Sequence, residues 1–331
     1  MIKENWDCLN IKGKVFLVTD ENVAKLYLDD FDSLPRHILP SGEAAKNMEN
    51  IVKILEAMAG VGLDRKSTVI ALGGGVVTDM AGFAASIYMR GINWIALPTT
   101  LMGMVDAAHG GKTGVDFLGG KNLVGTFHKP SLVYCNISTL STLPPEDFIS
   151  GLAEVIKYGI IKDEPLLDYL GDNQNTILSR NHNALTHIIQ RSINIKTDIV
   201  NQDEKEAGLR QILNFGHTFG HAIESGLNFT KPHGHCVALG MTCALDYSVR
   251  NLSLNQAQAD RAIKIMEGFG LPTTLRHAPE LPANKIYNLM LKDKKAINQN
   301  LTLITTNKLG TAQITTKPTK PQVIKAIERI L

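Results

Sequence analysis

The chain has 331 residues, of which 44% are hydrophobic and 20% charged, and 34 Lys and Arg against 32 Asp and Glu leave a formal charge of +2. This composition is typical of a soluble folded protein and excludes disordered, collagen-like and fibrous classes. The length allows about two domains, and the near-neutral charge gives no indication of a nucleic-acid partner.

The cysteines and the apolar runs bear on the compartment. Cys8, Cys135, Cys236 and Cys243 include no C-x-x-C pair, which favours reduced, mostly buried thiols over a disulfide framework. No run approaches the ~20 apolar residues that span a bilayer, and the first residues lack the apolar segment of a secretory signal. We therefore expect a cytoplasmic protein without a membrane segment.

Short apolar runs alternate with amphipathic ones in the first half of the chain. Residues 15–18 predict a strand, followed by a helix to about Leu28. Buried strands are predicted at 67–72 and 94–97, with a helix over 76–88 between them. A helix is also predicted over 45–60, and its apolar stripe is Met48, Ile51, Val52, Leu55 and Met58. Strands alternating with helices indicate a parallel sheet in an α/β domain.

Helices dominate beyond the linker at residues 138–145. Helical spacing covers residues 150–162, 183–203, 210–227, 237–252 and 256–269, and residues 301–305 and 311–316 predict a hairpin. The sequence therefore predicts an α/β nucleotide-binding domain over residues 1–144 and a mainly helical domain over residues 145–331.

The glycine turn Gly73-Gly74-Gly75 separates a predicted buried strand from a helix. Residues without a Cβ let backbone N–H groups approach a diphosphate at a helix N-terminus. The spacing is not G-x-G-x-x-G, however, and a turn that serves packing alone fits equally well. Asp20 and Asn22 follow the first strand, where they either bind ribose hydroxyls or, as we favour, form an ordinary helix cap.

Residues 106–122 hold Lys112, Lys121, Asn122 and five glycines within seventeen positions. Lysines supply positive charge, and glycines let the backbone close around a ligand. A merely mobile surface loop needs neither the glycine pairs nor their short spacing. This segment is therefore predicted to bind an anion.

Two patterns in the second half suggest a metal site. His217 and His221 share one helix face, and His233 follows twelve residues later. A packed or surface histidine pair remains the alternative. Glu154 and Lys157 lie one turn apart on an apolar helix, where a simple ion pair is the alternative, although a buried pair is costly unless it serves a function.

Together these segments resemble the 3-dehydroquinate synthase family, within the sugar-phosphate cyclase group. The resemblance covers nearly the whole chain. Its motifs are Gly73 to Phe83, Tyr88-Met89-Arg90-Gly91, Pro98 to Leu101, Gly110-Gly111-Lys112-Thr113-Gly114, Gly120-Lys121-Asn122, Ala153 to Lys157, and Arg210 to His221.

The resemblance implies NAD and a divalent metal as cofactors, zinc or in its place cobalt or another ion, a homodimer, and an active site in the cleft between the domains. The metal ligands would be Glu154, His217 and His233. NAD would contact Asp20, Asn22, Glu43, Lys46, Gly73, Gly74, Gly75, Val76, Asp79, Thr99 and Thr100. The catalytic residues would be Lys112, Lys157, Lys196, Arg210, Asn214 and His221. Asp106, Lys121, Asn122 and, from a neighbouring subunit, Arg90 would bind the substrate.

The reaction implied by the resemblance converts 3-deoxy-arabino-heptulosonate 7-phosphate into 3-dehydroquinate and phosphate, a step of the shikimate pathway to aromatic amino acids. It proceeds by transient oxidation through NAD, phosphate elimination, reduction and intramolecular aldol closure. The alternatives are a metal-dependent NAD alcohol dehydrogenase, a cyclase for another sugar phosphate, and a non-catalytic nucleotide sensor. The many cationic residues argue against the dehydrogenase.

Three residues depart from the pattern of the family, which usually has Gly at Thr78, Asn at Asp116 and Glu at His235. Thr78 and Asp116 would change details of the cofactor fit that the resemblance implies. His235 would compete as a ligand or alter the polarity around the metal.

Overall fold

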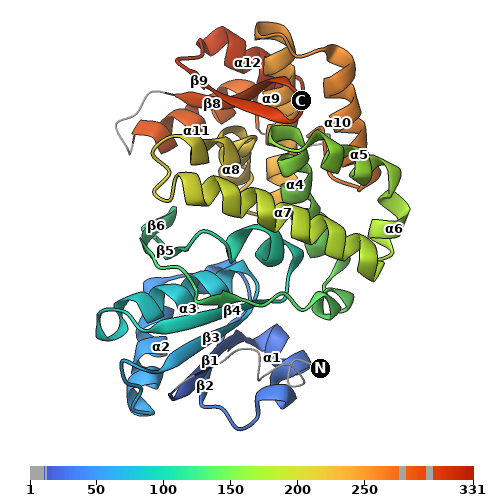
Figure 1. The fold of residues 1–331 in the computed structure, drawn as a ribbon. Coiled ribbons are helices and arrows are strands. Elements are labelled where there is room, and N and C mark those ends of the chain that lie inside the picture. Colours follow the sequence, from blue (N-terminus) through green and yellow to red (C-terminus); the bar gives the residue numbers. More distant parts are fainter. Residues whose placement is uncertain (1–10, 12, 276–280, 296–300) are drawn as a thin grey trace. The chain divides into compact units, whose positions relative to one another are not determined.

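The computed structural model describes residues 11, 13–275, 281–295 and 301–331 (Figure 1). The chain folds into two compact units, which we call the N-terminal and C-terminal units, and the division falls at the bond between Leu143 and Pro144. None of the helices in the described ranges combines the length and apolar character that a bilayer crossing requires.

A parallel sheet of five strands forms the centre of the N-terminal unit, with strand order β2-β1-β3-β4-β7. The strands are β1 (Val15–Asp20), β2 (Arg36–Leu39), β3 (Thr68–Gly73), β4 (Asn93–Pro98) and β7 (Leu132–Val133). The helices are α1 (Glu21–Tyr27), α2 (Met48–Gly60) and α3 (Gly75–Ile87). A two-stranded hairpin of β5 (Lys112–Phe117) and β6 (Gly120–Phe127) follows β4.

Alternating side chains of β1 enter two cores, because successive residues of a strand point to opposite faces. Phe16 and Val18 pack with residues of α2 and α3, whereas Leu17 packs on the other face with Phe31. The predicted stripe of α2 is wrong at Val52, which is exposed. Ile54 is buried instead, so the core-facing stripe of α2 runs through 51, 54 and 58.

The C-terminal unit is mainly helical (Figure 1). Its helices are α4 (Pro145–Ile161), α5 (Glu164–Asp172), α6 (Gln174–Leu178), α7 (His182–Gln202), α8 (His217–Gly226), α9 (His233–Asn251), α10 (Gln256–Gly268), α11 (Ala283–Lys295) and α12 (Lys320–Glu328). The predicted hairpin is confirmed as β8 (Thr302–Lys308) and β9 (Thr311–Thr316). The predicted α/β and mainly helical fold classes are confirmed.

The helix predicted over residues 210–227 is wrong, because the chain breaks there. Residues Leu209–Asn214 form a 3₁₀ turn, Gly216 takes a left-handed φ of 79°, and α8 begins only at His217. The helix predicted from 237 starts four residues earlier, directly after Pro232. Both differences concern predicted metal ligands, since His217 and His233 each become the first residue of a helix.

Cys135, Cys236 and Cys243 are free, and the last two are buried. Cys8 lies outside the described residues.

Candidate active site

The carboxyl ends of β1, β3 and β4 lie at one edge of the parallel sheet. β2 and β3 flank β1 on opposite sides, so the strand order reverses between β1 and β3. Open α/β sheets bind ligands at such a reversal, outside the carboxyl ends of their strands. Asp20 ends β1, Gly73 ends β3 and Thr99 follows β4. The fold therefore brings residues predicted to bind a nucleotide from three strands to one edge.

Asp20 caps α1 at this edge. Its Oδ1 accepts the backbone N–H groups of Asn22 at 2.9 Å and Val23 at 3.1 Å. The hydroxyl of Ser41 donates to the same oxygen at 3.2 Å. The favoured interpretation of Asp20 as a helix cap is thus confirmed, while the nucleotide contacts of Asp20 and Asn22 stay predictions.

The glycine turn joins β3 to α3 and lies close to the residues after β4. The N–H of Thr99 donates to the carbonyl of Gly73 at 3.0 Å. A Cβ on Gly74 would come within 3.1 Å of the Thr100 side chain, and one on Gly75 within 3.3 Å of Ala107. Bare backbone at the N-terminus of a helix suits a diphosphate, so these residues fit a dinucleotide.

Buried Lys46 links two sets of predicted residues. Its Nζ donates to Asp79 Oδ2 at 2.7 Å and to Asn122 Oδ1 at 2.5 Å. Burial alone would lower the pKa of Lys46, but the charges of Asp79 and Glu43 outweigh burial and raise this pKa. Glu43 also pairs with Lys121 at 3.4 Å. Residues predicted to contact NAD therefore lie beside residues predicted to bind the substrate: Glu43, Lys46 and Asp79 beside Lys121 and Asn122.

A β-bulge shapes the hairpin that carries Asn122. The register between β5 and β6 shifts between Val115 and Phe117, so Asp116 lies at the irregularity. Its Oδ1 accepts the backbone N–H of Asn122 at 2.7 Å, and Asn122 has a left-handed φ of 52°. Asp116 therefore stabilises the backbone of Asn122, a contact that an Asn at this position would make equally through its amide oxygen.

Other predicted residues of this unit lie on separate elements. Asp106 belongs to the π-helical turn Gly103–Ala107, a form that occurs frequently at functional sites. Lys112 begins β5 and is exposed, and Arg90 lies beyond α3 with a left-handed φ of 69°. Thr78 is buried in α3, and its hydroxyl donates to the carbonyl of Gly75 at 3.1 Å, so the hydroxyl is satisfied within the helix.

In the C-terminal unit, α4 carries a buried ion pair. Glu154 and Lys157 are each 1% exposed and contact one another one helical turn apart. Neither oxygen of Glu154 accepts a hydrogen bond from the described part of the chain. The Nε2 of His217 lies 3.4 Å from Glu154 Oε1.

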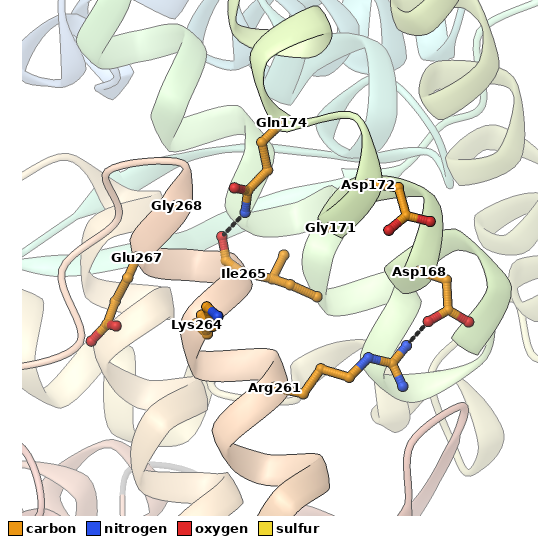
Figure 2. Close-up of a pocket in the computed structure, with 9 residues that line it drawn as sticks. All are labelled: Asp168, Gly171, Asp172, Gln174, Arg261, Lys264, Ile265, Glu267 and Gly268. Atoms are coloured by element: carbon orange, nitrogen blue, oxygen red, sulfur yellow. Dashed lines mark hydrogen bonds and ion pairs between the residues drawn. The ribbon is translucent and has the colours of Figure 1, made fainter.

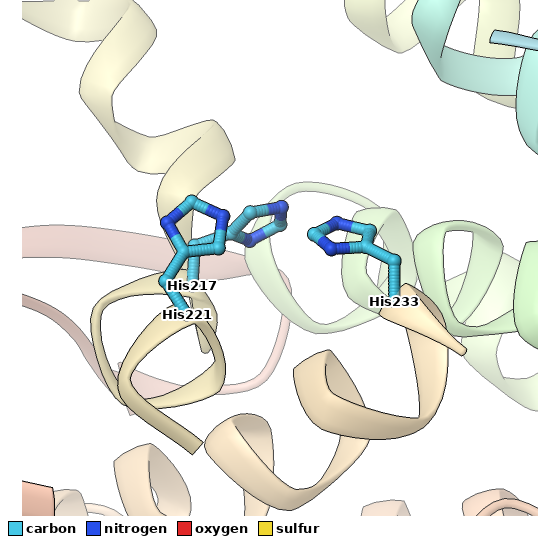
Figure 3. A group of neighbouring side chains, drawn as sticks. All are labelled: His217, His221 and His233. Atoms are coloured by element: carbon cyan, nitrogen blue, oxygen red, sulfur yellow. The ribbon is translucent and has the colours of Figure 1, made fainter. Parts of the chain in front are cut away.

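Three imidazoles gather at one place (Figure 3), and that of His217 lies beside the Glu154 carboxylate. His217 and His221 project from α8 and His233 from the first position of α9, and one nitrogen of each lies within 4.8 Å of the others. Burial, and next the positive charge of Lys157, lower the pKa of His217 well below its usual value. The imidazole is therefore neutral and able to ligate a metal.

The donor set fits a divalent metal. Neutral imidazoles and a carboxylate are ligands of catalytic zinc, which keeps further positions open for substrate. Lys157 contacts one oxygen of Glu154, Oε2, and the other, Oε1, faces His217 Nε2, so this carboxylate oxygen and this ring nitrogen are two donors that one cation would bind together. His235 lies outside the three-histidine group, because two residues along a helix turn its side chain away from that of His233.

The segment between α7 and α8 folds around predicted anion-binding residues. Arg210 is 2% exposed and donates to the carbonyl of Glu204, and its own backbone N–H donates to Asp203 Oδ2 at 2.9 Å. Asn214 donates to Glu206 Oε1 at 2.6 Å. Lys196 is buried on α7.

Sequence reasoning missed three acidic residues of this region. Asp203 orders the segment through backbone amides, and Glu206 holds the Asn214 amide. Glu224 contacts His233 Nδ1 at 3.3 Å. The spacing 217, 221, 224 on one helix face would have indicated Glu224, whereas no periodicity marks the other two.

Residues of α5, α6 and α10 line a surface pocket (Figure 2). Its Arg261 pairs with Glu164 and Asp168, and Gln174 donates to the carbonyl of Ile265 at 3.3 Å. None of the predicted site residues lines the pocket. Its polar groups tie helices together and do not indicate a ligand.

Comparisons with known proteins decide the family. One family model, the N-terminal domain of 3-dehydroquinate synthase, matches residues 36–150, and its C-terminal counterpart matches residues 151–296. The chain belongs to the 3-dehydroquinate synthase family. The resemblance drawn from the sequence motifs is confirmed.

Relatives within the family extend over most of the chain. A 3-dehydroquinate synthase from Acidithiobacillus ferrooxidans is 44% identical over 313 residues, which cover 92% of this chain and 85% of that protein. One from Acetivibrio thermocellus is 42% identical over 302 residues, covering 89% of this chain and 83% of the relative.

Solved structures agree with the family assignment in fold. The 2-epi-5-epi-valiolone synthase from Streptomyces hygroscopicus, with NAD⁺ and Zn²⁺ bound, has a TM-score of 0.92 at 26% identity, covering 99% of this chain and 94% of that one. A probable glycerol dehydrogenase from Sinorhizobium meliloti shares the fold with a TM-score of 0.69 at 16% identity, covering 99% and 93%.

Proposed function

We propose that this chain converts 3-deoxy-arabino-heptulosonate 7-phosphate into 3-dehydroquinate and phosphate. The observation that carries the proposal is the group formed by buried Glu154, neutral His217 and His233 in a member of this family. Its ligand types suit a metal that binds a substrate's neighbouring oxygens.

We propose NAD and zinc, or another divalent metal, as cofactors, and the 2-epi-5-epi-valiolone synthase structure with NAD⁺ and Zn²⁺ supports this. Glu154, His217 and His233 would hold the metal, and the glycine turn with Lys46 and Asp79 would hold NAD. When bound, the two groups supply a reversible hydride acceptor and a Lewis acid for the substrate hydroxyls.

The chain's own residues supply charge and proton transfer. Arg210, Lys112 and Lys196 would neutralise the carboxylate and phosphate of the substrate, since cationic donors form strong hydrogen bonds with both anions. Lys157, Lys121 and the amides of Asn122 and Asn214 would position the substrate. His221, exposed and beside His217, would exchange a proton with a substrate hydroxyl through a ring nitrogen.

The competing activity within this fold is that of an NAD alcohol dehydrogenase. A dehydrogenase releases NADH in proportion to turnover, whereas the proposed reaction returns the hydride to its substrate and is redox-neutral. The test supplies substrate and a catalytic amount of NAD, and follows phosphate and the absorbance of NADH together. We expect phosphate without accumulation of NADH; stoichiometric NADH without phosphate would establish the dehydrogenase.

A cyclase acting on another sugar phosphate is the second competitor, because carboxylate and phosphate attract the same cationic side chains. Parallel assays with sugar phosphates that carry or lack the carboxylate separate the two. We expect turnover only with the carboxylate. Equal turnover without it would contradict the proposed substrate.

The ligand assignment is tested with a matched pair of histidine variants. His233→Ala should bind zinc much more weakly, retain little of it through purification and lose activity, whereas His235→Ala, two residues along α9 and outside the histidine group, should keep both. Elemental analysis of the purified proteins measures the metal. Full zinc content in His233→Ala would show that the assigned ligands are wrong.

We also propose a cytoplasmic homodimer. The free thiols of Cys135, Cys236 and Cys243 support a reducing compartment. Exposed Ile87 and Met89 beside Arg90 support a subunit contact there. Analytical ultracentrifugation should give twice the chain mass; a monomer with full activity would contradict a partner's Arg90 at the active site.

A further inference from the structure

One face of α8 carries more than its two histidines. His217, His221 and Glu224 occupy positions i, i+4 and i+7 of this helix, which places all three on one stripe. His233 begins the next helix, α9, and faces this stripe (Figure 3). Glu224 is 3% exposed, so its carboxyl group is withdrawn from water beside the histidine group.

The buried carboxylate contacts one particular nitrogen of His233. Glu224 Oε2 lies 3.3 Å from Nδ1. An ionised carboxylate only accepts hydrogen bonds, so an ionised Glu224 pairs with the tautomer of His233 that carries its proton on Nδ1. In that tautomer the lone pair lies on Nε2, the nitrogen opposite Glu224.

His217 has the same arrangement with a different acceptor. Its Nδ1 lies 3.2 Å from the carbonyl oxygen of Phe215, and its Nε2 faces Glu154 Oε1 at 3.4 Å. Both histidines that the proposed function makes ligands together with Glu154 therefore have an oxygen within reach of Nδ1. The backbone fixes one ring, and a buried side chain fixes the other.

We propose that Glu224 is a positioning residue that holds His233 in the Nδ1-protonated tautomer and in the ring orientation that presents Nε2 to a divalent metal. The inference rests on the proposed function, which supplies the metal. Partners of this kind increase the basicity of a ligand and reduce its rotational freedom, and losing one typically costs 10–100-fold in metal affinity.

The first test measures zinc affinity of the full-length chain by competition with a chromophoric chelator, independently of activity. Glu224→Met removes the acceptor at similar volume, and Glu224→Gln keeps an oxygen that accepts from Nδ1. We expect Glu224→Met to bind zinc 10–100-fold more weakly, and Glu224→Gln to recover most of the loss. Equal affinities in wild type and Glu224→Met would overturn the proposal.

A double-mutant cycle separates positioning from a general structural effect. Once His233 is replaced by Ala, Glu224 has no ring to orient, so Glu224→Met should weaken zinc binding no further. An undiminished effect of Glu224→Met in the His233→Ala background would also overturn the proposal. The absorption spectrum of bound cobalt should change in Glu224→Met and return toward the wild type in Glu224→Gln.

Nuclear magnetic resonance of the wild-type chain tests the tautomer of His233 even where the Glu224 variants fail to fold. With ¹⁵N-labelled histidine, the signal of His233 is assigned by its loss in His233→Ala. We expect a protonated Nδ1 and an unprotonated Nε2, and the reverse tautomer would contradict the role of Glu224. If the wild-type chain binds neither zinc nor cobalt, the metal assignment of the proposed function is wrong. If the wild-type chain and Glu224→Met bind zinc equally well, only the role of Glu224 is wrong.

Discussion

Replacing Gly240 by Ala tests how closely α8 and α9 must approach to assemble the histidine group. A Cβ at Gly240 would lie 2.0 Å from the carbonyl oxygen of Gly216 and 2.7 Å from the backbone nitrogen of Gly220. Those two atoms form the first hydrogen bond of α8, at 2.8 Å. The added methyl group therefore meets backbone that carries His217, and no side chain is able to move aside.

The size of the effect follows from these distances. Real Cβ atoms essentially never approach another heavy atom closer than 3.0 Å, so a contact at 2.0 Å requires a displacement of about 1 Å. Forcing a methyl group into close packing costs roughly 1–3 kcal/mol. Metal sites tolerate deviations of only about 0.2 Å in ligand distance, so separating the helices should weaken zinc binding on the order of tenfold or more.

Two measurements check this prediction: urea unfolding in metal-free buffer and chelator competition for zinc. Gly60→Ala is the matched control, because Gly60 ends α2 and a Cβ there meets nothing within 4 Å. The control should change the free energy of unfolding by less than about 1 kcal/mol and leave zinc binding unchanged. Wild-type stability and zinc affinity in Gly240→Ala would refute the argument from close packing.

Three further predictions use buried or hydrogen-bonded groups. Lys157→Met leaves the buried Glu154 charge without its partner and should lower the free energy of unfolding in chelator-treated protein by about 3–5 kcal/mol; a loss below about 1 kcal/mol in a urea titration would contradict this. Burial raises the pKa of the Cys135 thiol to about 12, so this thiol should resist alkylation at pH 8. Mass spectrometry of the labelled peptide measures the rate, and rapid labelling of Cys135 in the folded protein would contradict the prediction. Hydrogen bonds from backbone amides, foremost that of Arg210, lower the pKa of Asp203. The ionised carboxylate therefore contributes fully to stability above the unfolded pKa of about 3.9, and this contribution is lost as the pH falls through the folded value. Asp203→Asn should thus reduce the loss of unfolding free energy between pH 5 and lower pH, and an unchanged pH dependence in that range would contradict the prediction.

Local sequence patterns predicted correctly those helices, strands and hairpins whose structure depends on their own residues. The buried strands β3 and β4 and the hairpin β8–β9 follow from apolar runs bounded by turn residues. The His217 and His221 pair was predictable because helical spacing alone places the two rings on one face. The motifs then indicated the family, since they span nearly the whole chain.

Features that depend on contacts distant in sequence were not predictable. The break before α8 arises where Gly216 takes a left-handed φ and lies against α9, a contact that the periodicity of residues 210–227 does not contain. Val52 fits the helical stripe of α2 as well as Ile54 does, and only the position of the sheet decides which is buried. Glu206 binds Asn214 because the intervening turn folds back.

Lys46 makes the chemistry at the sheet edge and the shape of the β5–β6 hairpin energetically interdependent. Its ammonium group donates to Asp79 on α3 and to Asn122 on β6. A ligand that competes for either acceptor changes the free energy of the other contact, and thermodynamic reciprocity requires the same coupling in the opposite direction. We therefore expect a substitution of Lys46 to alter both the affinity of the proposed nucleotide site and the conformation of Asn122, so that neither readout alone measures the contribution of this lysine.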